Sequence, residues 1–363
     1  MNPRSLSFDS SFDNPAKPVN FRDIAREAGV SPAAVSLALR DSPQISAPVR
    51  QKIREVAKRM GYRPNPLLAA YQASVRSRKP VKFQAVLGWI NDNPDEQAWT
   101  RPWSKPMLDG ARARAGVLGF QLDEIWVPET KIEDPADNAR RWQKVMRARG
   151  IYGVILPAIY HPQHGVLLWE GFGVVCVGRH HIVVAKSIRP TKEIHEHHRV
   201  NSDYFSNMRL AFSQLKKAGC KRIGLAISSY HDNETDHAYS AAFLRDSMDM
   251  PKKDQIPLLI ETNVVGAVGA WVSQYKPDAV ICSHSEMLDA IRKLGLKVPG
   301  DLRVAHLNVA SDVADWSGID RRLAYVGSAA VDMLSAHLMR NESGVPPYAK
   351  ETMIEGVWME GKT

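Results

Sequence analysis

The side chains with the clearest chemistry near the start of this chain are cations. Residues 1–80 hold 14 lysines and arginines against 6 acidic residues, a net charge of +8 out of the +9 of all 363 residues. The remaining residues hold 34 basic against 33 acidic side chains. A basic block on one small segment is typical of a module that neutralises the phosphates of a polyanion with a salt-sensitive affinity. A solvated charged surface is the alternative, and charge alone does not separate the two.

The apolar pattern of residues 19–62 predicts three short helices that would position those cations. Gly29 provides a turn after the first helix, and Ser31-Pro32 is a typical start for the second. Asp41-Ser42-Pro43 breaks the chain, Ser46 precedes the third helix as its cap, and Gly61 ends it. The apolar faces are Phe21, Ile24, Ala25 and Ala28; then Val35, Ala38 and Leu39; then Val49, Ile53, Val56, Ala57 and Met60. This order is typical of a helix-turn-helix.

From residue 81 onward, strand-like and helix-like runs alternate, which predicts parallel α/β layers. About 280 residues is large for one core, so we expect two lobes. The strand-like runs are Phe83–Ile90, Gln121–Val127, Gly153–Leu156, Val174–Val177, Arg222–Ile227, Pro257–Ile260, Ala279–Cys282, Arg303–Leu307 and a last strand at Thr352–Trp358. The helical runs include Asp137–Arg149, Tyr204–Ala218 and Ser285–Leu294.

Composition also predicts where the chain acts. Residues 1–18 are polar and poor in apolar side chains, so we expect a disordered tail. The sequence has no signal-peptide pattern and no apolar run long enough to span a membrane, so we expect no membrane partner. Its cysteines, Cys176, Cys220 and Cys282, are widely spaced in apolar contexts and indicate reduced thiols in the cytoplasm.

Metal and enzyme chemistry find little support in the sequence. His195 and His198 in Glu193–His198 could share a helical face, but the segment is polar and no cysteine lies close, so we expect a solvated loop without a metal. We find no Gly-rich phosphate loop, no nucleophile elbow and no other zinc-ligand spacing. The sequence therefore predicts no cofactor and no enzyme.

The block DIAREAGVSPAAVSLALRDSPQIS, followed by GYRPNP, resembles the headpiece of the lactose/galactose-repressor (LacI/GalR) family of bacterial transcription regulators. The match covers roughly the first fifth of the chain. The resemblance implies an N-terminal all-α helix-turn-helix headpiece at 19–62, a hinge helix and linker at 63–80, and a C-terminal α/β two-lobed periplasmic-binding-protein-like domain at 81–363 for effector binding and dimerisation. Lobe one would span about 81–179 plus 321–346, and lobe two about 181–318 plus 347–360. The chain would cross between lobes near Arg179–His181, Gly318–Arg321 and Pro346–Pro347.

The same resemblance places helix Pro32–Leu39 in the major groove of DNA. The implied DNA contacts are Asn20, Phe21, Ser31, Pro32, Ala33, Ala34, Ser36, Leu37, Arg40, Gln44 and Tyr62, with Asn65, Leu68 and Tyr71 in the hinge. Arg22, Arg50, Lys52 and Arg54 are available for phosphates. In the hinge, Tyr71 would be the apolar wedge in the minor groove, with Leu67-Leu68 as the alternative, unless the hinge helix is simply buried on the effector domain.

Three departures from the family pattern bear on DNA specificity. Positions that often read bases fall on Pro32, Ala33 and Leu37, none of which offers the polar group that discriminates bases by roughly 1–3 kcal/mol. We therefore expect a weaker or A·T-biased operator preference that depends on Gln44, Arg40, DNA shape or the hinge.

Ligands in folds of this type sit at the carboxyl ends of the strands. The candidate ligand residues are Trp89, Asn91, Asp92, Trp103, Arg179, Tyr230, Asp232, His237, Tyr239, Ser283, His284, Asn308, Trp316 and Asp320. Tryptophan with Asn or Asp is typical of a sugar site. In this chain Tyr239 replaces an arginine of sugar-binding relatives, with His237 as a partial substitute, and Ser283-His284 replaces their Asn-Asp pair.

Together these features predict a homodimeric, ligand-responsive transcription regulator, a repressor, located in the cytoplasm at the nucleoid. A small headpiece grips one half-site, so binding a palindromic operator requires a dimer. The expected partners are a double-stranded DNA operator, a carbohydrate effector and a second copy of the chain. Two alternatives stay open, which are an effector-independent DNA-binding regulator and a sugar-processing enzyme.

Overall fold

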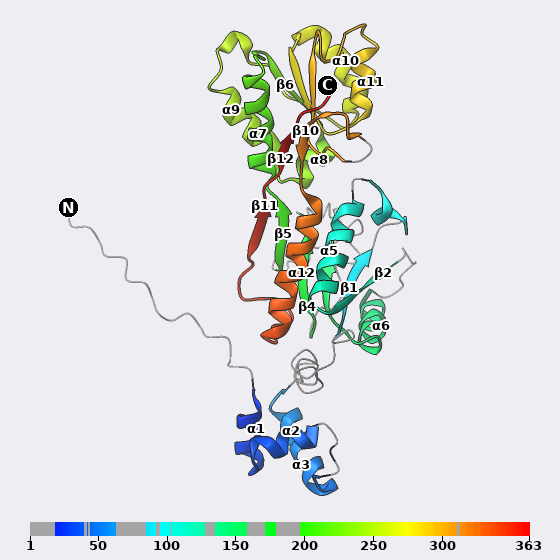
Figure 1. The fold of residues 1–363 in the computed structure, drawn as a ribbon, viewed down its shortest axis with the longest axis vertical. Coiled ribbons are helices and arrows are strands. Elements are labelled where there is room, and N and C mark those ends of the chain that lie inside the picture. The colour runs from blue at the N-terminus through cyan, green and yellow to red at the C-terminus, as the bar shows by residue number, and fades with distance from the viewer. Residues whose placement is uncertain are drawn as a thin grey trace, which may run out of the picture. The chain divides into compact units, whose positions relative to one another are not determined.

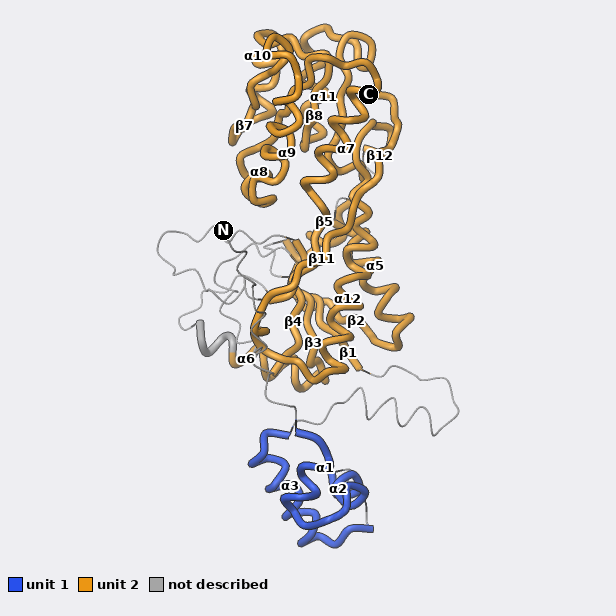
Figure 2. The backbone as a smooth tube through the Cα atoms, turned by 90° about the vertical axis from the view of Figure 1, so that its left-hand side faces the viewer, with its two compact units in different colours: residues 1–69 blue, residues 70–363 orange. Residues whose placement is uncertain are grey.

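The computed structural model describes residues 19–39, 42, 44–62, 85–91, 95–102, 104–127, 135–157, 171–178, 197–310 and 313–363. The chain divides into two compact units, residues 1–69 and 70–363, which are coloured separately in Figure 2. The first unit holds the predicted DNA contacts of the helix-turn-helix, and the second holds the predicted ligand residues. Among helices of the described residues, none combines the length and apolarity needed to traverse a bilayer.

The first unit contains three helices, α1 (Phe21–Ala28), α2 (Pro32–Leu39) and α3 (Ala47–Arg59). The predicted helix order is confirmed, and the helices share a small core of Ile24, Ala25, Ala28, Val35, Ala38, Ile53, Val56 and Ala57. Two local predictions were wrong. Val49 is exposed instead of facing the core, and the Ser46 side chain makes no capping hydrogen bond. Proline near the start of α3 has no N–H to satisfy, which reduces the need for that cap.

The start of α1 is held by a reciprocal cap. The Asn20 side chain accepts hydrogen bonds from the backbone N–H groups of Arg22 (2.8 Å) and Asp23 (3.2 Å). In return, Asp23 Oδ2 accepts from the backbone N–H of Asn20 at 3.1 Å. Gly29 ends the helix in the left-handed region at φ 70°, as the turn requires. This cap and turn fix the angle at which α2 leaves α1.

The second unit contains two six-stranded sheets, which confirms the predicted two-sheet α/β fold. The first sheet is entirely parallel and has the order β11-β5-β4-β3-β1-β2. Its strands are β1 (Ala85–Asn91), β2 (Phe120–Trp126), β3 (Ile151–Leu156), β4 (Gly173–Val177), β5 (His198–Ser202) and β11 (Glu351–Ile354). Helices α5 (Lys105–Val117), α6 (Pro135–Ala148) and α12 (Leu323–Met339) pack against it (Figure 1). We call this sheet and its helices the first lobe.

The second sheet has the order β12-β10-β9-β8-β6-β7 and is parallel except for its edge strand β12. Its strands are β6 (Ile223–Ser228), β7 (Leu259–Glu261), β8 (Ala279–Cys282), β9 (Arg303–His306), β10 (Ser317–Asp320) and β12 (Val357–Met359). Its helices are α7 (Tyr204–Lys217), α8 (Ser229–Glu234), α9 (Ala238–Ser247), α10 (Val264–Tyr275) and α11 (Glu286–Arg292). Apolar residues of α7 and α9 share one core cluster with the sheet, and those of α10 and α11 share another. This is the second lobe.

The chain passes between the lobes at places that differ in part from the prediction. The crossing expected near Arg179–His181 is wrong, because β4 and β5 lie in the same sheet and the chain still belongs to that sheet at Ser202. The crossing expected near Gly318–Arg321 agrees with the end of β10. The crossing expected near Pro346–Pro347 and the single strand Thr352–Trp358 are wrong, because β11 and β12 belong to different sheets (Figure 1).

The three crossing segments lie side by side and are tied together by hydrogen bonds. The backbone N–H of Asp203 donates to the carbonyl oxygen of Ile354 at 2.9 Å. The backbone N–H of Gly356 donates to Oδ1 of the buried Asn207 at 2.8 Å. A Cβ on Gly356 would lie 2.7 Å from the carbonyl oxygen of Asp320, so only glycine fits this approach. The lobes are therefore joined by one bonded bundle of chain and not by loose linkers.

The histidine cluster also differs from its prediction. His197 is buried and β5 begins at His198, so the expected solvated loop is wrong at this end, while Glu193–Glu196 lie outside the described residues. The segment is buried because β5 pairs with β4 on one side and with β11 on the other, which places its polar residues inside the lobe. The His198 ring lies 4.4 Å from the ring of His337 on α12, and His198 Nδ1 accepts from the Lys350 N–H at 2.9 Å. No group of His, Cys, Asp and Glu in the described parts of the chain is arranged to hold a metal ion.

Two glycines on α5 offer a matched test of how closely α5 and α12 pack. A Cβ on Gly110 would overlap the carbonyl oxygen of Ala324, whereas a Cβ on Gly116 would meet nothing within 4 Å. We expect Gly110→Ala to lower the free energy of unfolding by about 1–3 kcal/mol. Gly116→Ala should be neutral or raise it by up to about 1 kcal/mol, because alanine favours the helix. All nine tryptophans lie in the second unit, so denaturation followed by tryptophan fluorescence measures both variants there. Equal effects would contradict the close packing.

The buried histidines of the first lobe predict a loss of stability in acid. Burial lowers the pKa of His197 and of His337 to about 4, from an ordinary value near 6.5. Because the folded pKa lies below the unfolded one, this stabilisation is complete above pH 6.5 and is lost as the pH falls toward 4. Between pH 7.5 and pH 5.0, each of these histidines should cost about 2 kcal/mol of unfolding free energy.

His337→Gln isolates one of these contributions. The variant should lose about 2 kcal/mol less between the two pH values than the parent chain, as measured by chemical denaturation with tryptophan fluorescence. Tyr325→Phe, on the exposed side of the same helix, is the matched control and should keep the parent's pH dependence. An unchanged acid loss in His337→Gln would show that His337 is not neutral in the folded lobe.

Candidate DNA-contact surface and ligand cavity

The DNA contacts predicted for the first unit lie at the start of α1, along α2, in the loop before α3 and directly after α3. The exposed members of that set are Asn20, Ser31, Pro32, Ala33 and Gln44. The half-buried members are Phe21, Ala34, Ser36, Leu37 and Tyr62. Arg40, Asn65, Leu68 and Tyr71 lie outside the described residues. The first turn of α2 thus offers an exposed surface that is mostly apolar.

Several of these residues also stabilise the first unit itself. The side-chain oxygen of Asn20 is engaged in the α1 cap, and Ser31 Oγ accepts from the backbone N–H of Ala34 at 3.1 Å. The rings of Phe21 and Tyr62 lie 5.6 Å apart, and burial raises the pKa of Tyr62. The Ser31 hydroxyl hydrogen and the Asn20 amide nitrogen keep the capacity to donate to a phosphate oxygen.

The cations of the first unit differ in how far they are engaged. Arg22, Lys52 and Arg54 have exposed side chains. Arg59 pairs with Glu27 at 2.7 Å. Arg50, which we expected to be available for phosphates, is half-buried and its Nη2 donates to the carbonyl oxygen of Ile45 at 3.4 Å. Arg50 therefore braces the loop before α3.

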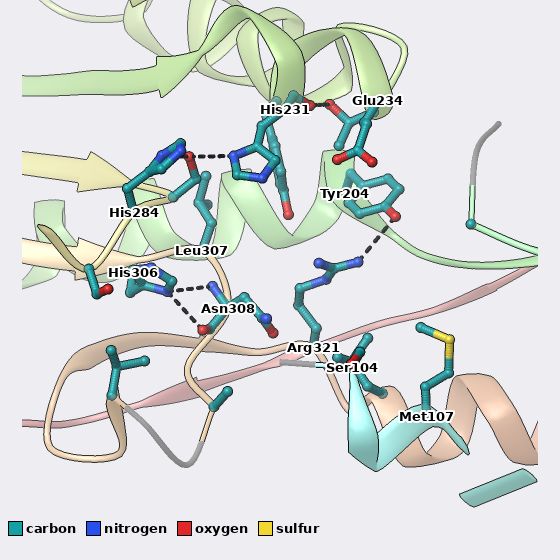
Figure 3. A pocket seen from close by; sticks show the side chains of 18 of the residues that line it. Ser104, Met107, Tyr204, His231, Glu234, His284, His306, Leu307, Asn308 and Arg321 are labelled. Atoms are coloured by element: carbon teal, nitrogen blue, oxygen red, sulfur yellow. Dashed lines mark hydrogen bonds between the residues drawn. The ribbon is translucent and has the colours of Figure 1, made fainter. Parts of the chain in front are cut away.

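A cavity of about 650 Å³ lies in the second unit, bordered by both lobes (Figure 3). From the first lobe it is lined by Trp99, in the short 3-10 helix Ala98–Thr100, and by residues of α5, the end of β4 and the start of α12. From the second lobe it is lined by residues that follow β6, β8, β9 and β10, together with the starts of α7 and α9. The cavity is thus at the carboxyl ends of parallel strands, where α/β folds bind ligands.

Some of the predicted ligand residues line this cavity and others do not. The lining members are Tyr230, Tyr239, Ser283, His284 and Asn308. Asp92, Trp103 and Arg179 lie outside the described residues.

The other predicted ligand residues have structural positions away from the cavity. Trp89 and Asn91 are buried within β1, where Trp89 packs edge-on against Trp99 at 5.2 Å and Asn91 Nδ2 donates to Glu96 O at 2.7 Å. The prediction failed for Asn91 because β1 extends through Asn91 instead of ending before it, and it failed for Trp89 because that side chain points into the core from within the strand.

The lobe-two members that miss the cavity hold turns in place. Buried Asp232 accepts hydrogen bonds from His237 Nδ1 at 2.8 Å and from Ser240 Oγ at 3.1 Å, which fixes the turn between α8 and α9. Trp316 packs edge-on against His306 at 5.4 Å. Asp320 Oδ1 accepts from the backbone N–H of Arg322 at 2.7 Å.

Several cavity residues were missed from the sequence. The most important are Arg321, His306, Tyr204 and Glu234. Glu234 follows the same strand end as Tyr230, so extending that segment along α8 would have found it. Arg321 lies in a crossing segment, which was predicted only to connect the lobes.

Three histidines form one wall of the cavity, and short contacts order all three. His231 Nδ1 lies 3.1 Å from Ser283 Oγ, and the same oxygen lies 3.0 Å from His284 Nδ1. The rings of His231 and His284 are 4.7 Å apart. His306 Nδ1 lies 2.7 Å from the carbonyl oxygen and 3.1 Å from the amide nitrogen of Asn308.

The imidazoles of His231 and His284 are held in their neutral forms. Burial, together with His284, Arg321 and His306, lowers the pKa of His231 to about 4. Burial also lowers the pKa of His284. A general base works best with a pKa near the operating pH, so His231 is poorly matched to activate Ser283 near neutral pH. A neutral imidazole does offer one donor and one acceptor, which suits the recognition of hydroxyl groups.

Arg321 enters the cavity from the end of β10. Its Nε donates to Ser202 Oγ at 3.2 Å, its Nη2 donates to Tyr204 Oη at 3.1 Å, and its Cζ lies 4.9 Å from the centre of the Tyr204 ring. Burial acts to lower the pKa of Arg321, but the nearby Tyr204, Tyr239 and Glu234 outweigh it and raise the pKa. Burial raises the pKa of Glu234, against a hydrogen bond with Tyr230 and the charge of Arg321.

Two different protein families match the chain, one in each of its two compact units. Residues 20–65 match the family described as bacterial regulatory proteins, lacI family, and residues 212–357 match the periplasmic binding protein-like domain. The chain is 45% identical over 74 residues to catabolite control protein A of Priestia megaterium. That match spans 20% of this chain and 21% of the relative, about a fifth of its length.

Solved structures of similar fold cover nearly the whole chain. The complex of the transcriptional regulator CelR with cellobiose has a TM-score of 0.56 at 17% identity and covers 95% of this chain and 99% of that one. The lac repressor dimer bound to operator and the anti-inducer ONPF has a TM-score of 0.53 at 16% identity and covers 96% and 99%. At such identities the likeness establishes the fold alone. The sequence matches agree with the geometry of both units: the chain has a helix-turn-helix region that matches the lacI family of bacterial regulatory proteins, followed by a region that matches the periplasmic binding protein-like domain.

Proposed function

We propose that this chain is a transcription regulator, acting as a repressor, that binds an operator as a homodimer and responds to a carbohydrate ligand. The observation that carries the proposal is the helix-turn-helix unit, whose α2 exposes its first turn on the part of the chain that holds most of the net charge. Such a helix enters the major groove through its N-terminal residues. The lac repressor, which shares the fold, is described as a dimer bound to operator.

The proposed DNA contacts are those predicted from the sequence. Ser31, Asn20 and the exposed cations would bind phosphates, which orient the unit without reading sequence. Ala33, Ala34 and Leu37 would meet thymine methyl groups, and Gln44 would supply a polar contact to a base edge. Arg40 and the hinge residues Asn65, Leu68 and Tyr71 stay predictions, with Tyr71 as the proposed wedge.

The ligand response is proposed for the cavity of the second unit. Its histidines, Ser283 and Asn308 supply donors and acceptors for hydroxyl groups, and Trp99 contributes apolar surface. A ligand that contacts both lobes would shift the angle between them and change the operator affinity of the dimer. A 10–100-fold change requires a coupling free energy of about 1–3 kcal/mol. We place the protein in the cytoplasm at the nucleoid, without enzymatic activity.

Binding selection tests the operator proposal. We expect the full chain to select an A·T-biased site, with an affinity that falls steeply with salt because phosphate contacts release counterions. Gln44→Ala should weaken binding to the selected site by about 5–100-fold, which corresponds to the roughly 1–3 kcal/mol of a lost base contact. Gln51→Ala is the matched control, because the Gln51 amide is engaged by Glu55 at 2.9 Å on α3. A long G·C-rich consensus would contradict the A·T bias, and the absence of DNA binding would overturn the function.

Titration with a panel of sugars and sugar acids, followed by operator release, tests the ligand response. A ligand that binds should change operator affinity by about 10–100-fold. His284→Gln should weaken its binding by about 2–10-fold through the loss of one hydrogen bond. Gln274→Ala is the control, because Gln274 is exposed on α10 and does not line the cavity. If operator affinity responds to no ligand, the effector-independent regulator becomes the better description, and turnover of a bound sugar would favour the enzyme alternative.

A further inference from the structure

The cavity contains a guanidinium that has no carboxylate partner among the described residues. We propose that the ligand carries an oxyanion, a carboxylate or a phosphate, on a polyhydroxylated skeleton, and that Arg321 binds it. The ligand class would therefore be an acidic sugar derivative and not a neutral sugar. This inference rests on the proposed role of the cavity as the effector site, and it narrows the chemistry of that effector.

Arg321 is held in a fixed orientation by neutral groups. Ser202 Oγ accepts from Nε and Tyr204 Oη accepts from Nη2, at 3.2 and 3.1 Å, while the Tyr204 ring lies along the guanidinium at 4.9 Å. These contacts restrain the plane of the guanidinium and leave the Nη1 hydrogens without a partner among the described residues. A planar guanidinium with donors still available suits bonding to a carboxylate or phosphate.

Arg321 has no directly paired carboxylate among the described residues. No acidic side chain of the described residues comes within 4.0 Å of it. Glu234 acts on Arg321 only over a longer distance, and burial raises the pKa of Glu234. The other acidic residue of the cavity lining, Glu286, is exposed. A bound oxyanion would give this cation the direct counter-charge that the described residues do not supply.

The rest of the cavity suits the remainder of such a ligand. Figure 3 shows the imidazoles of His231 and His284 across the cavity from the Arg321 guanidinium. Neutral imidazoles and the Ser283 hydroxyl can exchange hydrogen bonds with hydroxyl groups but supply no second positive charge. The cavity therefore presents one cationic end and one hydroxyl-binding wall, which fits a skeleton with an anionic group at one end.

Matched pairs of probes test this inference on the full chain. We would titrate D-glucose against D-glucuronate, D-galactose against D-galacturonate, and D-glucose 6-phosphate, all at the same ionic strength. Tryptophan fluorescence reads the second unit alone, since all nine tryptophans lie there, so phosphate bound by the basic first unit does not interfere. We expect at least one acidic probe to bind ten-fold or more tightly than its neutral counterpart. The uronates and the phosphate ester distinguish the two sources of the oxyanion.

Two neighbouring arginines provide the variant and its control. Arg321→Gln should lower the affinity for the acidic probe by ten-fold or more and so remove the preference for it over the neutral sugar. Arg322→Gln, at the next position with an exposed side chain that does not line the cavity, should keep the preference. If Arg321→Gln does not fold, Arg321→Lys keeps the positive charge but loses the paired N–H donors of the guanidinium. A weaker preference for the acidic over the neutral probe in that variant supports the inference.

The outcomes that overturn the inference are distinct from those that overturn the function. A neutral sugar that binds as tightly as its acid, with operator release, refutes the oxyanion and leaves the proposed function intact. Acid preference that survives in Arg321→Gln refutes the role of Arg321. A chain that binds operator but none of the probes refutes the oxyanion and also removes support for a ligand-responsive regulator.

Discussion

The second unit depends on the hydrogen-bonded bundle in which three chain segments pass from one lobe to the other. Neither lobe is a continuous stretch of sequence, so their relative geometry is set where Asp203, Gly356 and Arg321 make their bonds to the neighbouring segments. Arg321 has two roles, because its hydrogen bond to Ser202 joins two crossing segments and its side chain also lines the cavity. A ligand that bonds to the Arg321 guanidinium therefore contacts the crossing segments directly. No other residue has to relay its effect to the connection between the lobes. This is the physical basis on which we propose that ligand and lobe angle are coupled.

Local signals made much of the fold predictable. In the first unit, the helical spacing of Ile24, Ala25 and Ala28, with Gly29 after them, is enough to fix α1, because the cap and the turn use neighbouring residues. Buried strands rich in branched apolar residues were equally clear, and β8 was predicted with its observed bounds. The strand β5 (HRVNS) could not be found this way, because its burial comes from pairing with β4 and β11 and not from its own composition. The same holds for the break at Gly356, which separates two strands only because other segments approach it.

The candidate cavity was predictable only as far as strand ends could be located. Tyr230, Ser283 and Asn308 follow strands whose apolar runs are distinct, and they line the cavity as the fold requires. Asn91 was misplaced by a shift of one residue at the end of β1, whereas Trp89 lies within that strand and its side chain is buried. Arg321 carries no signal of its own in the sequence, since an arginine after a short strand is ordinary. Its importance arises from tertiary contacts with Ser202 and Tyr204, more than a hundred residues earlier in the chain.

The three cysteines give the two lobes separate chemical reporters. Cys176 lies in β4 of the first sheet and Cys282 in β8 of the second, and both are buried, whereas Cys220 is half-buried. Burial raises the pKa of Cys176 and of Cys282 to about 12, so neither is a reactive thiolate while its sheet is closed. A thiol reagent would therefore modify Cys220 first. The slower rates at which it modifies Cys176 and Cys282 would measure how often the first and the second sheet open. The native cysteines thus report the opening of each lobe without an added label.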